Sequence, residues 1–188
     1  MAERPAALRG LPLLEDLGPL EGKRVLVRTD FNVPVEDTPQ GRVIRDDLRI
    51  RATVPTLEWL VAQGAEVVCA SHMGRPKGEV NPKYSLDVVA DRVAELVPGV
   101  SVMENLRFDP REEANDPTLV AELVDQFDAY VNDAFGASHR AHASVVGPPQ
   151  FLPSAAGRLL AREVEVLGGV LLEPQRPFVA IVGGAKVA

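Results

Sequence analysis

The sequence predicts an α/β protein with a three-layer, Rossmann-like fold, in which a mostly parallel sheet is covered by helices on both faces. Short β-branched runs alternate along the chain with segments whose apolar residues recur at helical spacing. The length of 188 residues suits one domain, or one domain and part of a second. Apolar residues make up 46% of the chain and charged residues 25%, which excludes wholesale disorder.

Five short runs predict the strands of this sheet. They lie at 23–30, 66–71, 100–107, 129–132 and 178–182. The first run leads into the turn signal Asn-Val-Pro at 32–34. The second is apolar almost throughout, as expected of a strand that is buried on both faces.

Four amphipathic segments predict the helices between these strands. They are expected at 56–63, 86–96, 117–127 and 154–172. The first should begin near Pro55 and end at Gly64. Ser85 and Asp116 are the predicted N-caps of the second and third helices, with Pro117 at the first position of the third.

The formal net charge of −7 argues against a general nucleic-acid binder. No apolar run reaches the roughly 18–20 residues of a membrane span, and the N-terminal segment lacks the apolar core of a signal peptide. The single cysteine, Cys69, excludes a framework of internal disulfides. We therefore expect a cytoplasmic protein, which can bind an anion only by gathering its cations locally.

Arginines lie at or just beyond the ends of four predicted strands, at the edge where parallel α/β sheets bind their ligands. They are Arg28, Arg75, Arg107 and Arg140. Several guanidinium groups around one point repel each other unless an anion lies among them, and each donates paired hydrogen bonds to phosphate or carboxylate. Asp30 and Asn32 supply acceptors for a hydroxyl group beside them. The pattern predicts a site for a small, highly charged substrate.

Other interpretations remain open for these residues. Any one arginine at a strand end is more often a surface ion-pair partner. Cys69, His72, His139 and His142 have the spacing of zinc ligands, although Cys69 lies in an apolar run and neighbouring arginines would oppose a divalent cation. No Gly-x-Gly-x-x-Gly follows the first strand, and no Walker A pattern occurs.

Five segments, in order, resemble the successive signatures of the phosphoglycerate kinase family. They are VLVRTDFNVP at 25–34, SHMGRP at 71–76 with KYSL at 83–86, ENLRF at 104–108, NDAFGASHRAHAS at 132–144 and VGGAKVA at 182–188. The resemblance runs from about Lys23 to Ala188, and several of its blocks are individually specific.

The resemblance implies two α/β lobes joined by a hinge helix. In the family, the N-terminal lobe binds 3-phosphoglycerate or 1,3-bisphosphoglycerate, and the C-terminal lobe binds ATP or ADP with Mg²⁺. We therefore expect a substrate-binding lobe at 1–153, the hinge helix and linker at 154–176, and the start of a truncated nucleotide-binding lobe at 177–188. One βα unit of the first lobe is shortened between Val97 and Val100, which should expose an edge of the sheet or reroute a strand.

The resemblance also implies roles for individual residues. Asp30 and Asn32 match residues that contact the substrate's hydroxyl and carboxyl end, with Phe31 between them. Arg49 and Lys186 match the catalytic cations at the transferring phosphoryl group, Lys186 from the nucleotide side. The basic patch for the 3-phosphate consists of His72, Arg75, Arg107 and Arg140, with Met73 and Gly74 in the same loop, and with Arg28, His139 and His142 farther from the substrate.

Three hypotheses follow. The first is the substrate-binding half of a phosphoglycerate kinase, monomeric, without a metal site of its own and inactive alone. The second is a non-catalytic module, derived from that lobe, that binds a phosphorylated metabolite. A coding sequence that continues in frame beyond Ala188 would favour the first, and a natural stop there would favour the second. The third is a zinc-binding structural domain.

Overall fold

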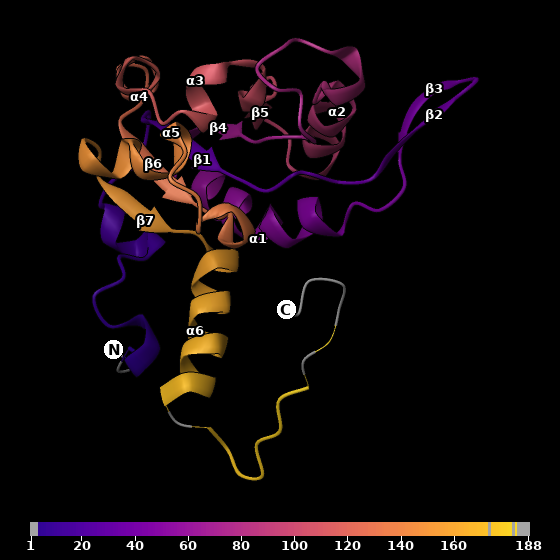
Figure 1. The fold of residues 1–188 in the computed structure, drawn as a ribbon. Helices are drawn as coiled ribbons and strands as arrows, with labels where there is room; N and C mark the ends of the chain where they lie inside the picture. Colours follow the sequence, from indigo (N-terminus) through magenta and orange to yellow (C-terminus); the bar gives the residue numbers. More distant parts are fainter. Residues whose placement is uncertain (1–3, 173, 182, 184–188) are drawn as a thin grey trace.

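The computed structural model describes residues 4–172, 174–181 and 183. Its centre is a five-stranded sheet in the order β5-β4-β1-β6-β7, and every neighbouring pair is parallel (Figure 1). The strands are β1 (Arg24–Arg28), β4 (Glu66–Ala70), β5 (Ser101–Val102), β6 (Ala129–Asn132) and β7 (Ser154–Ala156). The predicted α/β class with a parallel sheet is confirmed.

Helices cover the sheet on both faces because its central strand is apolar on both faces. Val25 and Val27 of β1 belong to a core cluster with Leu57 of α1 (Leu48–Ala62) and Val89 of α2 (Asp87–Leu96). Leu26 belongs instead to a second cluster, together with residues of α4 (Pro117–Val124). Successive side chains of a strand point to opposite faces, so one short run builds both cores.

Smaller elements complete the lobe. The helices α3 (Pro110–Glu113) and α5 (Ala143–Val146) lie beside the carboxyl ends of the strands, and α6 (Arg158–Leu172) extends away from the sheet (Figure 1). An antiparallel hairpin, β2 (Val35–Thr38) and β3 (Gly41–Ile44), follows β1 and projects beyond α2 (Figure 1). Turns of 3₁₀-helix lie at Ala6–Leu8, Leu14–Leu17, Pro82–Tyr84, Leu106–Phe108, Phe135–Ala137 and Pro148–Gln150. In the described part of the chain, none of the helices is both long and apolar enough to cross a bilayer.

Several local predictions are confirmed. Gly64 follows α1 with a φ of +78°, the left-handed conformation that ends a helix. Asp116 caps α4 by accepting from the backbone N–H of Thr118 at 2.8 Å, with Pro117 at the first position. The prediction of Ser85 as the N-cap of the second helix is wrong by one residue, because the N-cap of α2 is Leu86; the Ser85 hydroxyl nevertheless accepts from the N–H of Asp87 at 3.2 Å.

The predicted start of the first helix at Pro55 is wrong, because α1 begins at Leu48 and contains Pro55. The Asp46 carboxylate accepts from the N–H of Leu48 at 2.8 Å, which supports the first turn. Ile50 and Thr53 are buried, so the turns before the proline contribute to the core. Their packing outweighs the cost of an internal proline, about 3 kcal/mol.

Three further predicted elements differ from the structure. Of the run 100–107, only Ser101–Val102 forms a strand, because Glu104 and Asn105 turn away to bond to the loop at 73–86. Residues 154–156 form β7 rather than the first turn of the long helix, because they pair with β6. The predicted strand at 178–182 has no strand structure at 178–181, and Val182 lies outside the described residues.

The strand β5, next to the shortened βα unit, has only two residues. Its two residues pair with Val68 and Cys69 of β4, and β5 is the outermost strand on that side of the sheet. This edge of the sheet therefore presents only two residues for pairing.

Gly157 connects β7 to α6 at a point with no room for a side chain. A Cβ there would lie 2.2 Å from Oδ1 of the buried Asp133, whose carboxylate accepts from the N–H of Leu160 in the first turn of α6. We expect Gly157→Ala to lower the free energy of unfolding by about 2 kcal/mol or more in urea denaturation. Gly169→Ala is the control, since nothing lies within 4 Å of its Cβ position and helix propensity favours alanine by about 1 kcal/mol.

Burial raises the pKa of Asp133 to about 6, although hydrogen bonds from Thr56 and from the backbone at Leu160 and Leu159 oppose this rise. The folded state therefore binds this proton more tightly than the unfolded state, and the carboxylate destabilises the fold as pH rises from about 4 to above 6. We expect wild type to lose stability relative to the Asp133→Asn variant over this range, by up to about 3 kcal/mol in the free energy of unfolding. If urea titrations from pH 4 to 7.5 show a constant difference in stability between the two proteins, the raised pKa of Asp133 is refuted. The variant Asp125→Asn, at an exposed position, is the control.

Candidate functional site

A basic pocket of about 250 Å³ lies at the carboxyl edge of the sheet. It is lined by Asp30, Asn32, Arg49, His72, Gly74, Arg75, Arg107, Gly136, Ala137 and Arg140. Four of the ten lining residues are arginines, and the single acidic residue among them is Asp30. We use "basic pocket" for this set of residues throughout.

The pocket brings together most of the predicted site residues. Eight predicted residues line it, from Asp30 to Arg140. The side chains of Phe31 and Met73 are buried in the core instead, and Lys186 lies outside the described residues. Gly136 and Ala137 were missed, although they belong to the segment NDAFGASHRAHAS that directly follows β6.

The positive charge of the basic pocket is only partly compensated. Arg49 donates to Asp30 with 2.5 Å between Nη1 and Oδ2. Nε of Arg107 lies 3.3 Å from Oε1 of Glu113. Within the described residues, Arg75 and Arg140 have no ion-pair partner. The pocket therefore carries an excess of positive charge in a chain whose net charge is −7.

His72 contributes to the pocket as a neutral ring. Burial lowers its pKa to about 2, and the positive charges of Arg28, Arg107 and Arg140 act in the same direction. Burial also lowers the pKa of Arg107, against the opposing charge of Glu113. Arginine nevertheless stays ionised at neutral pH, so Arg107 presents a cation and His72 a neutral hydrogen-bonding group.

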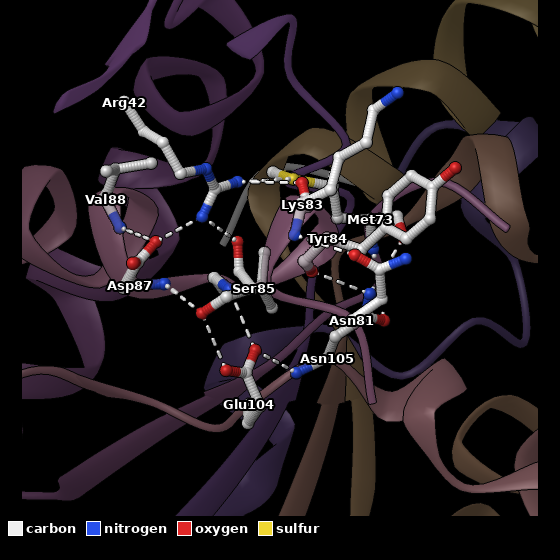
Figure 2. Close-up of polar contacts among 11 residues, drawn as sticks. Arg42, Met73, Asn81, Lys83, Tyr84, Ser85, Asp87, Val88, Glu104 and Asn105 are labelled. Atoms are coloured by element: carbon white, nitrogen blue, oxygen red, sulfur yellow. Dashed lines mark hydrogen bonds and ion pairs between the residues drawn. The ribbon is translucent and has the colours of Figure 1, made fainter. Parts of the chain in front are cut away.

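Asn105, which lies beside Met73 and Tyr84 in Figure 2, joins the loop that carries His72 and Gly74 to the segment that carries Arg107. Its Oδ1 accepts from the N–H of Met73 at 3.2 Å and of Arg107 at 3.1 Å. Its Nδ2 donates to the carbonyls of Met73 at 2.8 Å and of Tyr84 at 2.9 Å. The buried amide thus uses two donors and two acceptor positions, which is its full capacity.

Gly74 occupies a position that only glycine fits. Its φ is +60°, and a Cβ there would lie 2.4 Å from the ring of Tyr84. Its carbonyl accepts from Nη1 of Arg107 at 2.7 Å, and its N–H donates to Oδ1 of Asn32 at 3.0 Å. The backbone of Gly74 therefore links two of the polar side chains in the pocket.

The hairpin β2–β3, which the sequence patterns did not predict, supports the same loop from outside. Arg42 of β3 donates to the Asp87 carboxylate at 2.6 Å and to the carbonyls of Ser85 and Lys83 at 3.1 and 3.0 Å (Figure 2). Its Nη2 also lies 3.8 Å from the sulfur of Met73. The hairpin thereby anchors the chain between α2 and the loop that carries His72 and Gly74, which we call the pocket loop.

The structure contradicts the zinc-binding alternative. The thiol of Cys69 is fully buried in β4, and burial raises its pKa, which disfavours the thiolate that zinc requires. Nδ1 of His72 lies within hydrogen-bond distance of Arg28. Among the described residues, which include all four proposed ligands, no group of three or more His, Cys, Asp and Glu could hold a metal ion.

The fold and the site define a parallel α/β protein with a basic pocket at the carboxyl edge of its sheet. The model of the phosphoglycerate kinase family matches residues 14–103 and 97–188. The chain belongs to the phosphoglycerate kinase family.

Curated relatives and solved structures agree with this assignment. The chain is 49% identical to the phosphoglycerate kinase of Chloroflexus aggregans over 193 residues, covering 89% of this chain and 48% of the relative. It is 50% identical to that of Rubrobacter xylanophilus, covering 90% and 48%. The structure of phosphoglycerate kinase from Coxiella burnetii matches with a TM-score of 0.80 and 36% identity, over 90% of this chain and 47% of that one. The Pyrococcus horikoshii enzyme matches with a TM-score of 0.82 and 30% identity, over 94% and 50%.

The chain spans about half the length of the curated relatives it matches. The two segments matched by the family model overlap at 97–103, a stretch that contains the short edge strand β5. The match to the family model is therefore split into two segments at the place where the sequence predicted a shortened βα unit.

The contacts of Asn105 predict a large effect of a small substitution. Asn105→Asp keeps the acceptors but removes both donors, which leaves the carbonyls of Met73 and Tyr84 unpaired and adds a buried charge. We expect the free energy of unfolding in urea to fall by about 3 kcal/mol. Asn81→Asp is the control, because the exposed Asn81 uses only its Oδ1, toward the N–H of Lys83. Equal stabilities of the two variants would refute this role of Asn105.

Proposed function

We propose that the chain is the substrate-binding half of a phosphoglycerate kinase. This enzyme transfers a phosphoryl group reversibly between 1,3-bisphosphoglycerate and ADP, giving 3-phosphoglycerate and ATP. The observation that carries the proposal is the basic pocket, in which Arg49, Arg75, Arg107 and Arg140 converge at the sheet edge. A phosphorylated carboxylic acid brings the negative charge that such a cluster needs.

The pocket divides into two parts that suit the two ends of this substrate. His72, Arg75, Arg107 and Arg140 are proposed to bind the 3-phosphate. Asp30 and Asn32 are proposed to orient the hydroxyl and the carboxyl end, with Arg49 held at that end by its ion pair with Asp30. Arg49 is then suited to cancel charge on the phosphoryl group as it is transferred.

The reaction explains why the pocket needs no general base. In the direction that consumes ATP, the attacking group is a carboxylate that is already ionised at neutral pH. No proton has to be removed before the attack, so in-line positioning and charge neutralisation remain as the main tasks. A pocket of arginines with a neutral histidine supplies both.

The nucleotide and its Mg²⁺ are proposed to enter as the second substrate, held mainly outside this lobe. Lys186, the proposed contact from that side, lies outside the described residues. The apolar side chains of Val166, Leu167 and Leu171 on α6 are exposed, which suits a helix between two lobes. Since β7 ends at Ala156 and α6 begins at Arg158, we place the end of the substrate lobe at Gly157.

Because transfer requires both substrates in line, we propose that this chain alone binds 3-phosphoglycerate without turning over ATP. We further propose a cytoplasmic monomer. The glycolytic role of the family supports the compartment.

Calorimetric titration with 3-phosphoglycerate tests the proposal. We expect saturable binding that weakens with salt, and a loss of about tenfold or more in affinity for Arg75→Ala and for Arg107→Ala, since each removes a charged donor. Arg162→Ala on the exposed surface of α6 is the control and should bind like wild type. Unchanged affinity in both pocket variants would refute the site. Equal affinity for inorganic phosphate and 3-phosphoglycerate would favour a non-catalytic binding module instead.

A further inference from the structure

A row of buried polar side chains lies behind the basic pocket. Arg28 at the end of β1, Ser144 in α5 and Glu112 in α3 are all fully buried. Nε of Arg28 lies 2.9 Å from Oγ of Ser144, and this Oγ lies 2.6 Å from Oε1 of Glu112. None of the three lines the pocket, and family resemblance gave Ser144 and Glu112 no role.

The direction of each hydrogen bond in this row follows from the chemistry of arginine. A guanidinium group can only donate, so Oγ of Ser144 accepts from Arg28. The single hydroxyl proton of Ser144 is then free to be donated to Oε1 of Glu112. The backbone N–H of Ser144 donates to Oε2 at 2.9 Å, so both oxygens of Glu112 act as acceptors, as expected of a carboxylate. Ser144 thus connects a buried cation to a buried anion.

The other side of Arg28 faces His72. Nη2 of Arg28 lies 3.3 Å from Nδ1 of the ring. Since the guanidinium donates here too, Nδ1 must accept and carries no proton. The ring is surrounded by groups that carry or can gain a positive charge, namely Arg28, Arg107, Arg140 and His142. Glu112 lies behind Arg28, on the far side of Ser144. A neutral ring with an unprotonated Nδ1 carries its proton on Nε2.

We propose that Ser144 and Glu112 are positioning residues, which act through Arg28 to hold His72 in the tautomer that donates an Nε2–H hydrogen bond to an anion in the basic pocket. The proposal rests on the proposed function, because the anion is taken to be the phosphate of 3-phosphoglycerate. An imidazole that presented a lone pair to that phosphate would repel it, so the tautomer decides whether His72 helps or hinders binding.

Ser144 is the residue through which this arrangement can be broken. Without its hydroxyl, Nε of Arg28 loses its acceptor, and the buried guanidinium retains the carbonyl of Thr29 and the ring of His72. The Glu112 carboxylate lies behind the lost hydroxyl and attracts the unpaired Nε, and a shift of Arg28 toward it withdraws the donor from Nδ1 of His72.

Nitrogen-15 NMR of the histidine rings reads the tautomer directly and needs no ligand. The chain has three histidines, so the spectrum is simple to assign with single His→Gln variants. In wild type we expect His72 to stay neutral, with its proton on Nε2, from pH 5 to 8. In Ser144→Ala we expect a mixture of the two neutral tautomers over the same pH range, because burial and the remaining arginines keep the ring uncharged. Glu112→Gln should also mix the two tautomers, because it loosens the Ser144–Arg28 pair, and it should leave the ring neutral, since the loss of a nearby negative charge favours the uncharged imidazole.

Titration with 3-phosphoglycerate then links the tautomer to binding. We expect Ser144→Ala to raise the Kd about tenfold, the usual effect of losing one hydrogen bond to a charged group. Ser154→Ala is the matched control, since this β7 hydroxyl donates only to the carbonyl of Leu152 at 2.8 Å. It should leave both the His72 signals and the Kd as in wild type.

The proposal is overturned if His72 in wild type carries its proton on Nδ1, or titrates as a free histidine does. It is also overturned if folded Ser144→Ala shows the wild-type tautomer and the wild-type Kd. Should the variants fail to fold by circular dichroism, the tautomer of wild type alone decides. If the NMR results are as expected and wild type does not bind 3-phosphoglycerate, the proposed function fails while the positioning of His72 by Ser144 stands.

Discussion

The burial of the Arg28 guanidinium at the end of the central strand is the constraint on which the basic pocket depends. A charge inside a protein costs several kcal/mol unless it is paired and hydrogen-bonded. Arg28 meets this requirement with Ser144, the carbonyl of Thr29 and His72, and Glu112 supplies the opposite charge behind Ser144. These partners come from β1, the loop after β4, α3 and α5. One buried charge therefore sets the relative positions of the segments around the pocket.

The acidic groups near the basic pocket leave two of its arginines available to bind an anion. Glu112 and Glu113 of α3 compensate the guanidinium groups of Arg28 and Arg107 from behind, and Asp30 holds Arg49 at one end. Arg75 and Arg140 have no such partner among the described residues. An acidic chain can thus present a locally positive surface to a small anion, which a uniform distribution of the same charges would not achieve.

Elements set by local signals were predictable, and those set by distant contacts were not. The cap formed by Asp116 and the stop at Gly64 depend on residues a few positions apart, so the sequence pattern was sufficient. The start of α1 and the strand β7 were mispredicted. In the first, core packing outweighs a proline, and in the second, pairing with β6 outweighs an amphipathic pattern that continued into α6.

By itself, the sequence determined the alternation of strands and helices that makes an α/β fold and the arginines at the strand ends, because periodicity and strand-end position are local properties. It also carried the family signatures that indicated Asp30, Asn32 and Arg49. Only the tertiary structure decided that Phe31 and Met73 face the core, that Asn105 and Arg42 hold the pocket loop, and that Ser144 joins Arg28 to Glu112. Arg28 and Ser144 are 116 positions apart, and no local pattern encodes a contact that exists only once β1 and α5 pack together.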